Sequence, residues 1–470
     1  MDHFRAARIG WVGIAEAAVS MELQGRRVLI VGLGQSGLAA ARLCLNQGAK
    51  VIGNDSRSAS QLDPAAQALG IELVLGGHDN APFEQVDLVV VSPGIPPLPQ
   101  LDRCVQRGVE VIGELELGWR FCKAPVLAVG GTNGKSTTTA LLAQLLLSQG
   151  LKVFAGGNLG SPLCEAVGHD YDALVVEVSS FQLERAPSFQ PKISVLLNVT
   201  DDHLDRYDSF QHYADAKGNA FVRQERGDFA IVPAGDPICL QQALRGHGRL
   251  IRFGQAGAAG VDSEIDYAVG SVGVIETLTG EQFDLTRSAL HGTHNWLNAA
   301  AAVAAARRFG AAPESIREGL QVFKPLHHRM ALAGEIAGVR YYDDSKGTNV
   351  GAAVTAVGGV PESRVVLIAG GRDKLGSYAP LRAALEKKGR ACVLIGEAAD
   401  KIAAALQGAV VLERAASMDE AVRIAAKLAQ KGDAVLLSPA CSSFDMFSGY
   451  AARGDAFVQA VKGLTQGESS

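Results

Sequence analysis

Short runs of valine, isoleucine and leucine alternate along the chain with alanine-rich segments. Four such runs are RVLIVG (27–32), APVLAVGG (124–131), ALVVEVSS (173–180) and VVLIAGG (365–371). They are mainly apolar and lead into glycine, serine or an acidic residue. Strands without polar alternation are buried on both faces, which predicts parallel sheets covered by helices. We therefore predict an α/β architecture throughout the chain.

The same style of strand recurs in KVIGND (50–55), DLVVVSPG (87–94), ISVLLNVT (193–200), ACVLIG (391–396), AVVLE (409–413) and DAVLLSP (433–439). Alanine-rich helices are predicted over 37–48 and 295–310. Segment 245–290 predicts short antiparallel strands, because brief apolar stretches alternate with turn residues there. Ligands of open α/β sheets bind at the carboxyl ends of the strands. The polar motifs at those ends are therefore the candidates for chemistry.

Two junctions divide the chain. GELELGWRFCKAP (113–125) predicts a helix and a link into a new strand, and VFKPLHHRM (322–330) brings a proline and a charge cluster after a long helix. A length of 470 residues is itself typical of about three domains. We predict an N-terminal extension over 1–20 and domains over 21–113, 114–325 and 326–470.

The extension has an apolar stretch that only faintly resembles a secretion signal, because Glu16 interrupts it. We expect it to be dispensable or loosely ordered, with Met21 as an alternative start.

Composition excludes several classes of protein. Apolar residues make up 47% and charged residues 20%, which excludes general disorder. The net charge of −5 argues against a nucleic-acid or acidic-membrane binder. We find no run of 18 apolar residues that would span a membrane. The 7 cysteines are scattered, without a CxxC pair or a Cys/His cluster, so we predict neither disulfides nor a zinc site, and a reduced cytoplasmic setting.

The strongest local motif is LAVGGTNGKSTTTALLAQLLL (127–147), in which a strand, a glycine-rich turn and a helix follow one another. Backbone N–H groups of such a turn converge on phosphate, and the helix N-terminus adds partial positive charge. Lys135 would reach the β- and γ-phosphates, and Ser136 or Thr137 would offer a hydroxyl to Mg²⁺. The motif departs from GxxxxGK[ST], because Val129 stands where its first glycine is expected.

Magnesium needs oxygen ligands in addition to phosphate. Glu177 ends the strand of ALVVEVSS, and NVTDDHLDRY (198–207) follows another strand. A carboxylate on a parallel strand next to a phosphate loop is well placed for a metal. We therefore take Glu177 and the residues of that segment as candidate metal ligands.

A second glycine turn lies near the start of the chain. Gly32, Gly34 and Gly37 follow a strand in GxGxxG spacing, and Asp55 ends the next strand. This is the dinucleotide-binding pattern, so a nicotinamide oxidoreductase is a competing hypothesis. Other anions, including the diphosphate of a UDP compound, could use the same turn.

Several further segments occur together in one order. They are GTNGKST (131–137), EVSSFQLE (177–184), NVTDDHLDRY (198–207), HGTHNWLNAAAA (291–302), HHRM (327–330), YDDSKGTN (342–349), AGGRDK (369–374) and SPACSSFDMFSGYAARGDAF (438–457). In these motifs, from about residue 27 to 460, the chain resembles the Mur ligases. DSKGTN together with SPACSSFDMF is similar to the members that add D-glutamate to UDP-N-acetylmuramoyl-L-alanine in peptidoglycan precursor synthesis.

The resemblance implies a fold and a reaction. The fold has an N-terminal Rossmann-like domain, a central P-loop ATPase-like domain with a mixed sheet and a C-terminal Rossmann-like domain. ATP phosphorylates a carboxylate, and the amine of an amino acid attacks the acyl phosphate. We expect a cytoplasmic monomer with ATP, D-glutamate and the UDP-sugar as its partners, and two Mg²⁺ ions.

Three alternatives remain. The first is another Mur ligase or a folylpolyglutamate synthase, although the synthase should lack the last two motifs. The others are the oxidoreductase and a nucleotide-gated binding protein without ligase chemistry.

The resemblance also implies residue roles for ATP and metal. Lys135 stabilises the transferring phosphoryl group, and Ser136, Glu177 and His203 surround magnesium together with Lys217, which is carried as a carbamate. His203 and Lys217 join Lys135 as catalytic positions. The remaining nucleotide contacts are Gly131, Thr132, Asn133, Gly134, Thr137, Asn295, Asn298, Arg329 and Asp344.

Two further sets are implied for the other substrates. The D-glutamate pocket comprises Lys346, Thr348, Lys374, Ser443 and Tyr450. Its lysines and hydroxyl groups suit a ligand with two carboxylates. The UDP-sugar site comprises Gly34, Gln35, Ser36, Asp55, Arg57, Ser92, Gly94 and Asn158.

Overall fold

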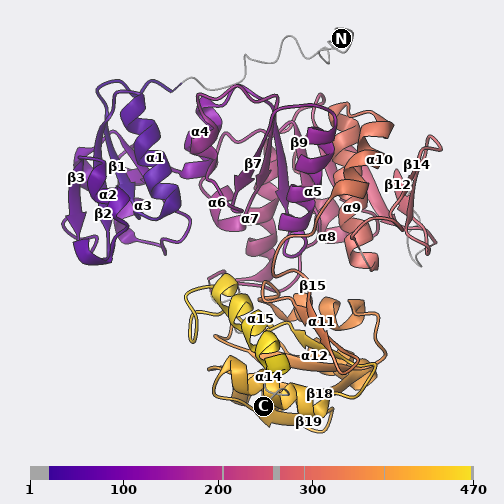
Figure 1. Ribbon diagram of the computed structural model, residues 1–470. Coiled ribbons are helices and arrows are strands. Elements are labelled where there is room, and N and C mark those ends of the chain that lie inside the picture. Colours follow the sequence, from indigo (N-terminus) through magenta and orange to yellow (C-terminus); the bar gives the residue numbers. More distant parts are fainter. Residues whose placement is uncertain (1–20, 204–205, 258–264, 291, 375, 467–470) are drawn as a thin grey trace.

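A computed structural model describes residues 21–203, 206–257, 265–290, 292–374 and 376–466. The extension predicted over 1–20 lies outside these residues. The described chain forms three α/β units, each built on its own sheet (Figure 1). The N-terminal and central units lie side by side, and the C-terminal unit packs below the central one in this view. This confirms the predicted fold class. Among the described helices, none is long and apolar enough to cross a membrane.

The N-terminal sheet is parallel and has the order β3-β2-β1-β4-β5. Its strands are β1 (Arg27–Val31), β2 (Lys50–Asp55), β3 (Glu72–Leu75), β4 (Leu88–Val91) and β5 (Glu110–Gly113). The helices are α1 (Gln35–Asn46), α2 (Pro64–Ala68) and α3 (Pro99–Gln106), with 3-10 turns over 59–61 and 83–85. The apolar runs of β1 and β4 are buried along almost their whole length, as expected for central parallel strands.

The central sheet is mixed, with the order β14-β13-β12-β11-β10-β9-β6-β8-β7. Its strands are β6 (Val126–Gly130), β7 (Val153–Gly157), β8 (Ala173–Glu177), β9 (Ile193–Leu196), β10 (Phe229–Pro233), β11 (Arg249–Gln255), β12 (Tyr267–Val269), β13 (Val274–Thr277) and β14 (Gln282–Asp284). The helices are α4 (Glu114–Phe121), α5 (Lys135–Ser148), α6 (Ser180–Leu183), α7 (Phe210–Val222), α8 (Pro237–Ala243), α9 (Thr293–Phe309) and α10 (Pro313–Val322), with a 3-10 turn over 163–166.

Helix α9 explains the alanine-rich segment of the central domain. Residues 299–306 are all fully buried, because α9 lies between α5 and strands β9 to β12. A helix that is apolar on every side is expected only in such a position. Small side chains let it approach both layers closely.

The strand prediction for 245–290 was partly wrong. β12, β13 and β14 are antiparallel to one another, as expected. β11, however, pairs parallel with both β10 and β12, and so continues the parallel part of the sheet. The local pattern could not reveal this, because a strand's neighbours are set by the connections rather than by its own sequence.

The C-terminal sheet has the order β15-β16-β20-β17-β18-β19, and only the edge strand β15 is antiparallel. Its strands are β15 (Ala331–Ile336), β16 (Val339–Asp343), β17 (Val365–Gly370), β18 (Gly389–Ile395), β19 (Val411–Arg414) and β20 (Ala434–Leu437). The helices are α11 (Val350–Gly359), α12 (Ala379–Lys388), α13 (Ala399–Leu406), α14 (Met418–Leu428) and α15 (Tyr450–Gln466). The domain boundaries at 113/114 and 325/326 stay a prediction; β5 ends at Gly113 and β15 begins at Ala331.

Candidate functional site

The phosphate loop joins β6 to α5 at the centre of the mixed sheet. Gly131 (φ 140°) and Gly134 (φ 85°) adopt backbone conformations that other residues rarely reach. A side chain at Gly134 would also collide with Asn298, because a Cβ there would lie 2.3 Å from its Oδ1 atom. The loop is therefore shaped both by its own glycines and by α9, which carries Asn298.

Lys135 folds back over this loop. Its Nζ donates to the carbonyls of Gly131 and Thr132, at 2.9 Å each. Burial lowers the pKa of Lys135, and the nearby carboxylates of Glu177 and Asp202 partly offset that effect. The ammonium group thus lies where an anion held by the loop would meet it.

Residues after β9 form the floor of the loop. Asn198 Oδ1 accepts from the backbone N–H of Asn133 at 2.9 Å, and its Nδ2 donates to the Asn133 carbonyl at 3.1 Å. The Thr132 hydroxyl lies 3.1 Å from the Tyr213 hydroxyl and accepts from the Thr200 N–H at 3.0 Å. The predicted site residues did not include Tyr213, and Asn198 was predicted only as a member of the segment NVTDDHLDRY (198–207). The signal for Asn198 was its place directly after an apolar strand.

Glu177 lies beside the loop at the end of β8 and is 1% exposed. Its Oε1 accepts from Asn158 Nδ2 at 2.7 Å, whereas its buried Oε2 has no hydrogen-bond partner among the described residues. Burial favours the neutral acid, but Lys135, Ser136 and Asn158 outweigh it and keep the pKa of Glu177 below its usual range. A buried, ionised oxygen without a partner fits a cation ligand.

Lys217 approaches the same loop from α7. It is 4% exposed, its Nζ donates to the Gly131 carbonyl at 2.9 Å, and the atom lies 4.6 Å from the centre of the Tyr213 ring. Burial, with the nearby charge of Lys135, holds the pKa of Lys217 well below its usual range. The amine is therefore biased toward the neutral, nucleophilic form.

His203 and Asp202 lie on the segment after β9. His203 has a left-handed backbone (φ 55°), its ring packs 4.9 Å from that of Phe181, and its Nε2 lies 3.7 Å from Asp202 Oδ2. Among the residues that the structure describes, no three His, Cys, Asp or Glu side chains gather closely enough to hold a metal. A metal beside Glu177 would need other oxygens as well, such as those of phosphate or of a modified lysine.

The C-terminal domain reaches this site directly. Arg329 Nη2 donates to the Ser136 hydroxyl at 2.6 Å. Asn349, which caps α11, donates to Asn133 Oδ1 at 3.0 Å and to Asp202 Oδ2 at 3.1 Å. The predicted nucleotide contacts include Arg329 but not Asn349, whose partners are distant in the chain.

Lys374 adds an ion pair to the same junction, with its Nζ 3.2 Å from Asp202 Oδ1. Burial favours the neutral form of Asp202, but Lys374 and His203 outweigh it and lower its pKa. Asp202 was predicted only as one of the candidate metal ligands in the segment NVTDDHLDRY (198–207). Its contacts with Lys374 and Asn349 add a further link between the two domains.

The other predicted nucleotide positions lie at the start of α9 and directly after β16. Asn295 lies in the first turn of α9, on the same helix as Asn298. Asp344 follows β16 and accepts from the Ser438 hydroxyl at 2.8 Å. Burial raises the pKa of Asp344 to about 7, although Ser438 and Arg329 act in the opposite direction.

Four of the predicted amino-acid residues lie on three loops of the C-terminal sheet, and the fifth, Tyr450, begins α15. Lys346 and Thr348 follow β16, and Lys346 Nζ lies 3.8 Å from the centre of the Tyr450 ring. Lys374 follows β17, and Ser443, which is 2% exposed, follows β20. Lys346 and Tyr450 are in contact, whereas Lys374 is drawn across to Asp202.

The first glycine turn joins β1 to α1 in the N-terminal domain. Gly32 is left-handed (φ 88°), and a Cβ on Gly37 would lie 1.8 Å from the Gly32 carbonyl oxygen. The Ser92 hydroxyl donates to that same carbonyl at 2.8 Å. Gly34 and Gln35 remain exposed, Ser36 is half-buried, and Gly94 is exposed on a neighbouring loop.

Asp55 supports this turn from the end of β2. Its Oδ2 accepts from the Leu33 N–H at 2.8 Å, and Arg57 donates to both of its oxygens at 2.9 and 2.7 Å. Burial would raise the pKa of Asp55, but Arg57 and the Leu33 N–H lower it to about 2. The turn therefore has a built-in ion pair. Arg206 of the central domain approaches the loop after β4, with its Nη1 3.5 Å from the Pro93 carbonyl oxygen.

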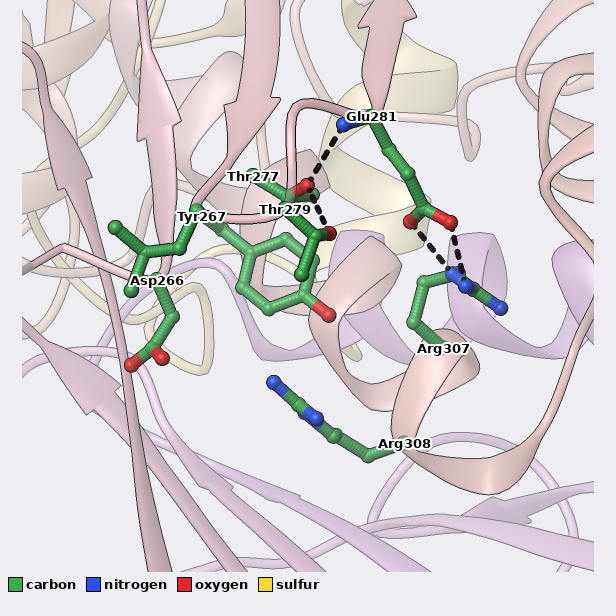
Figure 2. Close-up of a pocket in the computed structure, with 8 residues that line it drawn as sticks. Asp266, Tyr267, Thr277, Thr279, Glu281, Arg307 and Arg308 are labelled. Carbon is green, nitrogen blue, oxygen red and sulfur yellow. Dashed lines mark hydrogen bonds and ion pairs between the residues drawn. The ribbon is translucent and has the colours of Figure 1, made fainter.

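A small pocket lies elsewhere, beside β12, β13 and the C-terminal end of α9 (Figure 2). Its polar groups largely satisfy one another: Arg307 donates to both oxygens of Glu281 at 2.9 and 2.6 Å, and the hydroxyls of Thr277 and Thr279 lie 2.9 Å apart. Asn298 lies nearer the other end of the helix. We therefore do not include this pocket in the candidate site.

Comparisons with known proteins agree with this geometry. Three family models match in order: "Mur ligase MurD-like, N-terminal domain" over residues 26–113, "Mur ligase middle domain" over 129–306 and "Mur ligase, glutamate ligase domain" over 328–441.

Curated relatives match over nearly the whole chain. A UDP-N-acetylmuramoylalanine--D-glutamate ligase of Geotalea daltonii is 43% identical over 95% of this chain and 100% of its own length. A protein of the same name from Desulfosudis oleivorans is 43% identical over 95% of this chain and 98% of its own. Among solved structures, a pseudomurein peptide ligase type C from Methanothermus fervidus aligns with a TM-score of 0.61 at 20% identity, over 94% of this chain and 100% of that one.

Proposed function

This chain belongs to the Mur ligase family, and on that premise we propose that it uses ATP to join D-glutamate to UDP-N-acetylmuramoyl-L-alanine. In this reaction the substrate carboxylate attacks the γ-phosphorus of ATP and ADP leaves. The amine of D-glutamate then attacks the carbonyl carbon of the acyl phosphate, loses a proton and expels phosphate. The chemical difficulty is to bring two anions, a carboxylate and a triphosphate, into contact.

The cations around the phosphate loop can reduce the repulsion between the carboxylate and the triphosphate. Lys135 lies over the loop and Arg329 reaches Ser136 from the C-terminal domain. We propose that Lys135 stabilises the transferring phosphoryl group and that residues 131–137 hold the phosphates. Asn295, Asn298 and Arg329 are the further nucleotide contacts. Asp344 would accept from the ribose when ionised, and its pKa of about 7 leaves both forms accessible at neutral pH.

Glu177 and Lys217 are the residues best suited to hold magnesium. The unpartnered Glu177 Oε2 offers one ligand. The neutral Lys217 amine can add to the carbon of CO₂ and release one proton, which converts the amine into an anionic oxygen ligand. His203 and Ser136 complete the proposed set. Magnesium, when bound, would neutralise phosphate charge at this position.

The three loops of the C-terminal domain are the proposed D-glutamate site. Lys346 and Lys374 supply positive charge for two carboxylates, and Thr348, Ser443 and Tyr450 supply the remaining contacts. Lys374 is paired with Asp202, so a substrate carboxylate would compete with that carboxylate for the lysine. The proposed pocket therefore opens onto the phosphate loop, where the amine must attack.

The UDP-sugar is proposed to bind at the first glycine turn. Gly34, Gln35 and Ser36 present backbone N–H groups at the start of α1, and Gly34 has nothing within 4 Å of a Cβ position. Asp55, Arg57, Ser92 and Gly94 line the neighbouring strand ends. Asn158, which is bonded to Glu177, would meet the sugar-peptide part nearer the metal. A monomeric state and a cytoplasmic location stay predictions.

One observation carries the proposal: groups from the C-terminal domain, Arg329 and Lys374, reach the phosphate loop and the segment beside it. That arrangement supports a ligase rather than an oxidoreductase or a simple binding protein, because it joins a nucleotide site to a second, cationic site. The choice of D-glutamate rests on the relatives that match over nearly the whole chain, whose names state that activity.

The test is phosphate release from ATP by the full-length protein. We expect release with UDP-N-acetylmuramoyl-L-alanine and D-glutamate together, and little when either is omitted. L-glutamate, L-alanine and a diamino acid serve as matched replacements. Release that is independent of D-glutamate, or absent under all conditions, would overturn the proposal.

A further inference from the structure

Arg453 of α15 is the largest fully buried side chain among the described residues, with 0% exposure. Its side chain donates three hydrogen bonds in the described chain, all to uncharged acceptors. Nε donates to the Ser345 hydroxyl at 3.1 Å, Nη2 to the Ser345 carbonyl at 2.9 Å, and Nη1 to the Cys441 carbonyl at 3.2 Å. One guanidinium group therefore joins two loops that are far apart in the sequence.

A third loop closes against the same group. Gly371 has φ 134°, and a Cβ there would lie 3.2 Å from Arg453 Nη1 and 2.1 Å from the Ser442 carbonyl oxygen. The adjacent Arg372 pairs with Ser442 through two backbone hydrogen bonds of 3.0 and 3.1 Å. The loops after β16, β17 and β20 thus meet at the guanidinium of Arg453.

These are the loops that carry the proposed D-glutamate residues. Ser345 directly precedes Lys346, Gly371 lies three positions before Lys374, and Cys441 lies two positions before Ser443. Tyr450 begins the helix that carries Arg453, and its carbonyl accepts from the Ser345 hydroxyl at 2.8 Å. The loops after β16, β17 and β20 therefore contact Arg453 directly. The start of α15, which carries Tyr450, is held by Ser345, a hydrogen-bond partner of Arg453.

The charge of Arg453 requires an explanation. Burial lowers its pKa to about 10, although Cys441, Asp445, Asp343 and Asp344 act in the opposite direction, so it is still a cation at neutral pH. Its side-chain hydrogen bonds within the described chain nevertheless go to a hydroxyl and two backbone carbonyls. A buried, unpaired charge is destabilising unless hydrogen bonds compensate. A planar fork with five donors can satisfy acceptors on several loops at once, which a lysine ammonium cannot do.

We propose that Arg453 is a positioning residue for the amino-acid substrate, whose guanidinium sets the spacing of the three loops that bind it. Arg453 does not touch the substrate; it acts through Ser345, Gly371 and Cys441. The inference rests on the proposed function for the identity of the substrate, but the tie between the loops does not depend on it.

The first test compares R453K and R453Q with R382K. Arg382 is a matched control, because it also joins two segments of this domain, through Glu386 Oε1 at 2.9 Å and the Gln407 carbonyl at 2.7 Å, away from these loops. We expect KM for D-glutamate to rise roughly tenfold or more in both Arg453 variants, because donors to the loops are lost. KM for ATP should stay within about twofold, and R382K should match the wild type in both constants.

The second test is hydrogen exchange in the protein without substrates. R453K should increase exchange together in 343–349, 370–374 and 440–446, and leave the phosphate loop over 129–137 unchanged. The exchange measurement does not depend on which amino acid is the substrate. It can therefore overturn the inference about Arg453 independently of the proposed function. Unchanged exchange in these loops, or KM values for ATP and D-glutamate that rise together, would overturn the inference.

Discussion

The molecule contains two glycine-rich turns between a strand and a helix, and they differ in what surrounds them. The turn after β1 begins α1, and the turn after β6 begins α5. Both have a glycine at the residue before the helix. Gly34 has φ −80° and open space around it, whereas Gly134 has φ 85° and lies against Asn298.

The charges differ as well. The first turn is supported by a carboxylate, Asp55, whose charge is already neutralised by Arg57. The second is approached by Lys135, Lys217 and Arg329 from three different elements. A glycine turn by itself therefore indicates only an anion cradle. The groups that distant parts of the chain bring to it decide between a passive diphosphate site and a site for phosphoryl transfer.

Removing Lys217 should have the largest effect on this comparison. Lys217→Ala takes away the proposed metal ligand without touching the first turn, and we expect kcat to fall roughly a thousandfold. Short carboxylates such as acetate or formate should restore part of the rate, because they supply an anionic oxygen in the cavity. The measurement is steady-state phosphate release with and without the added acid.

The matched control is Lys192→Ala in the same domain, whose ammonium pairs with Asp228 at 3.1 Å, away from the loop. It should retain the wild-type rate and gain nothing from carboxylates. A Lys217→Ala enzyme with wild-type kcat would refute the carbamate proposal.

Substituting the two corresponding glycines tests the comparison more directly. Gly134→Ala forces an L side chain into φ 85° and against Asn298, so we expect KM for ATP to rise roughly tenfold and the protein to lose about 1–2 kcal/mol of stability. Gly34→Ala meets neither obstacle and should change stability by less than about 0.5 kcal/mol. It should raise only KM for the UDP-sugar, because the methyl group lies where the diphosphate would approach.

Thermal unfolding and the three KM values for each variant provide the measurement. Equal losses of stability in Gly134→Ala and Gly34→Ala would show that the two turns are equivalent, contrary to the comparison.

The predictions from the sequence were confirmed most often where a property is local. The apolar runs predicted β1, β6 and β8 because burial on both faces removes the polar alternation. Lys135 and Glu177 were found because each belongs to a strand end or helix start that a short motif defines. The parallel pairing of β11 was not predictable, because the same residues suit either orientation.

The junction between domains was the least predictable part. Asn133, Asp202 and Asn349 meet through hydrogen bonds of 3.0 and 3.1 Å, although the first and last are 216 positions apart. Each side chain taken alone resembles an ordinary loop residue. Only the folded arrangement, in which α11 begins against the phosphate loop, gives them a common role. Arg453 is a second example. Its position in a helix does not indicate that three loops contact its guanidinium group.

The smallest expected effect concerns Asp55. Its ion pair with Arg57 is one of the features by which the first turn differs from the second. Its pKa in the folded protein, about 2, lies below the ordinary value of 3.8. The ionised form therefore stabilises the fold above about pH 4, and this contribution is lost as the pH falls through about 2. We discount its size to about 1–2 kcal/mol, because Arg57 is 43% exposed and solvent screens the pair.

Asp55→Asn should therefore raise the hydrogen exchange of the segment around Leu33 by about tenfold, since the Leu33 N–H loses its charged acceptor. After correction for intrinsic rates, the difference from the wild type should be the same at pH 7 and pH 4, because Asp55 is still ionised at both. An ordinary aspartate would be partly protonated at pH 4, and the difference would shrink there. That shrinkage would show that Arg57 does not keep Asp55 ionised at pH 4, contrary to the built-in ion pair that distinguishes the first turn from the second.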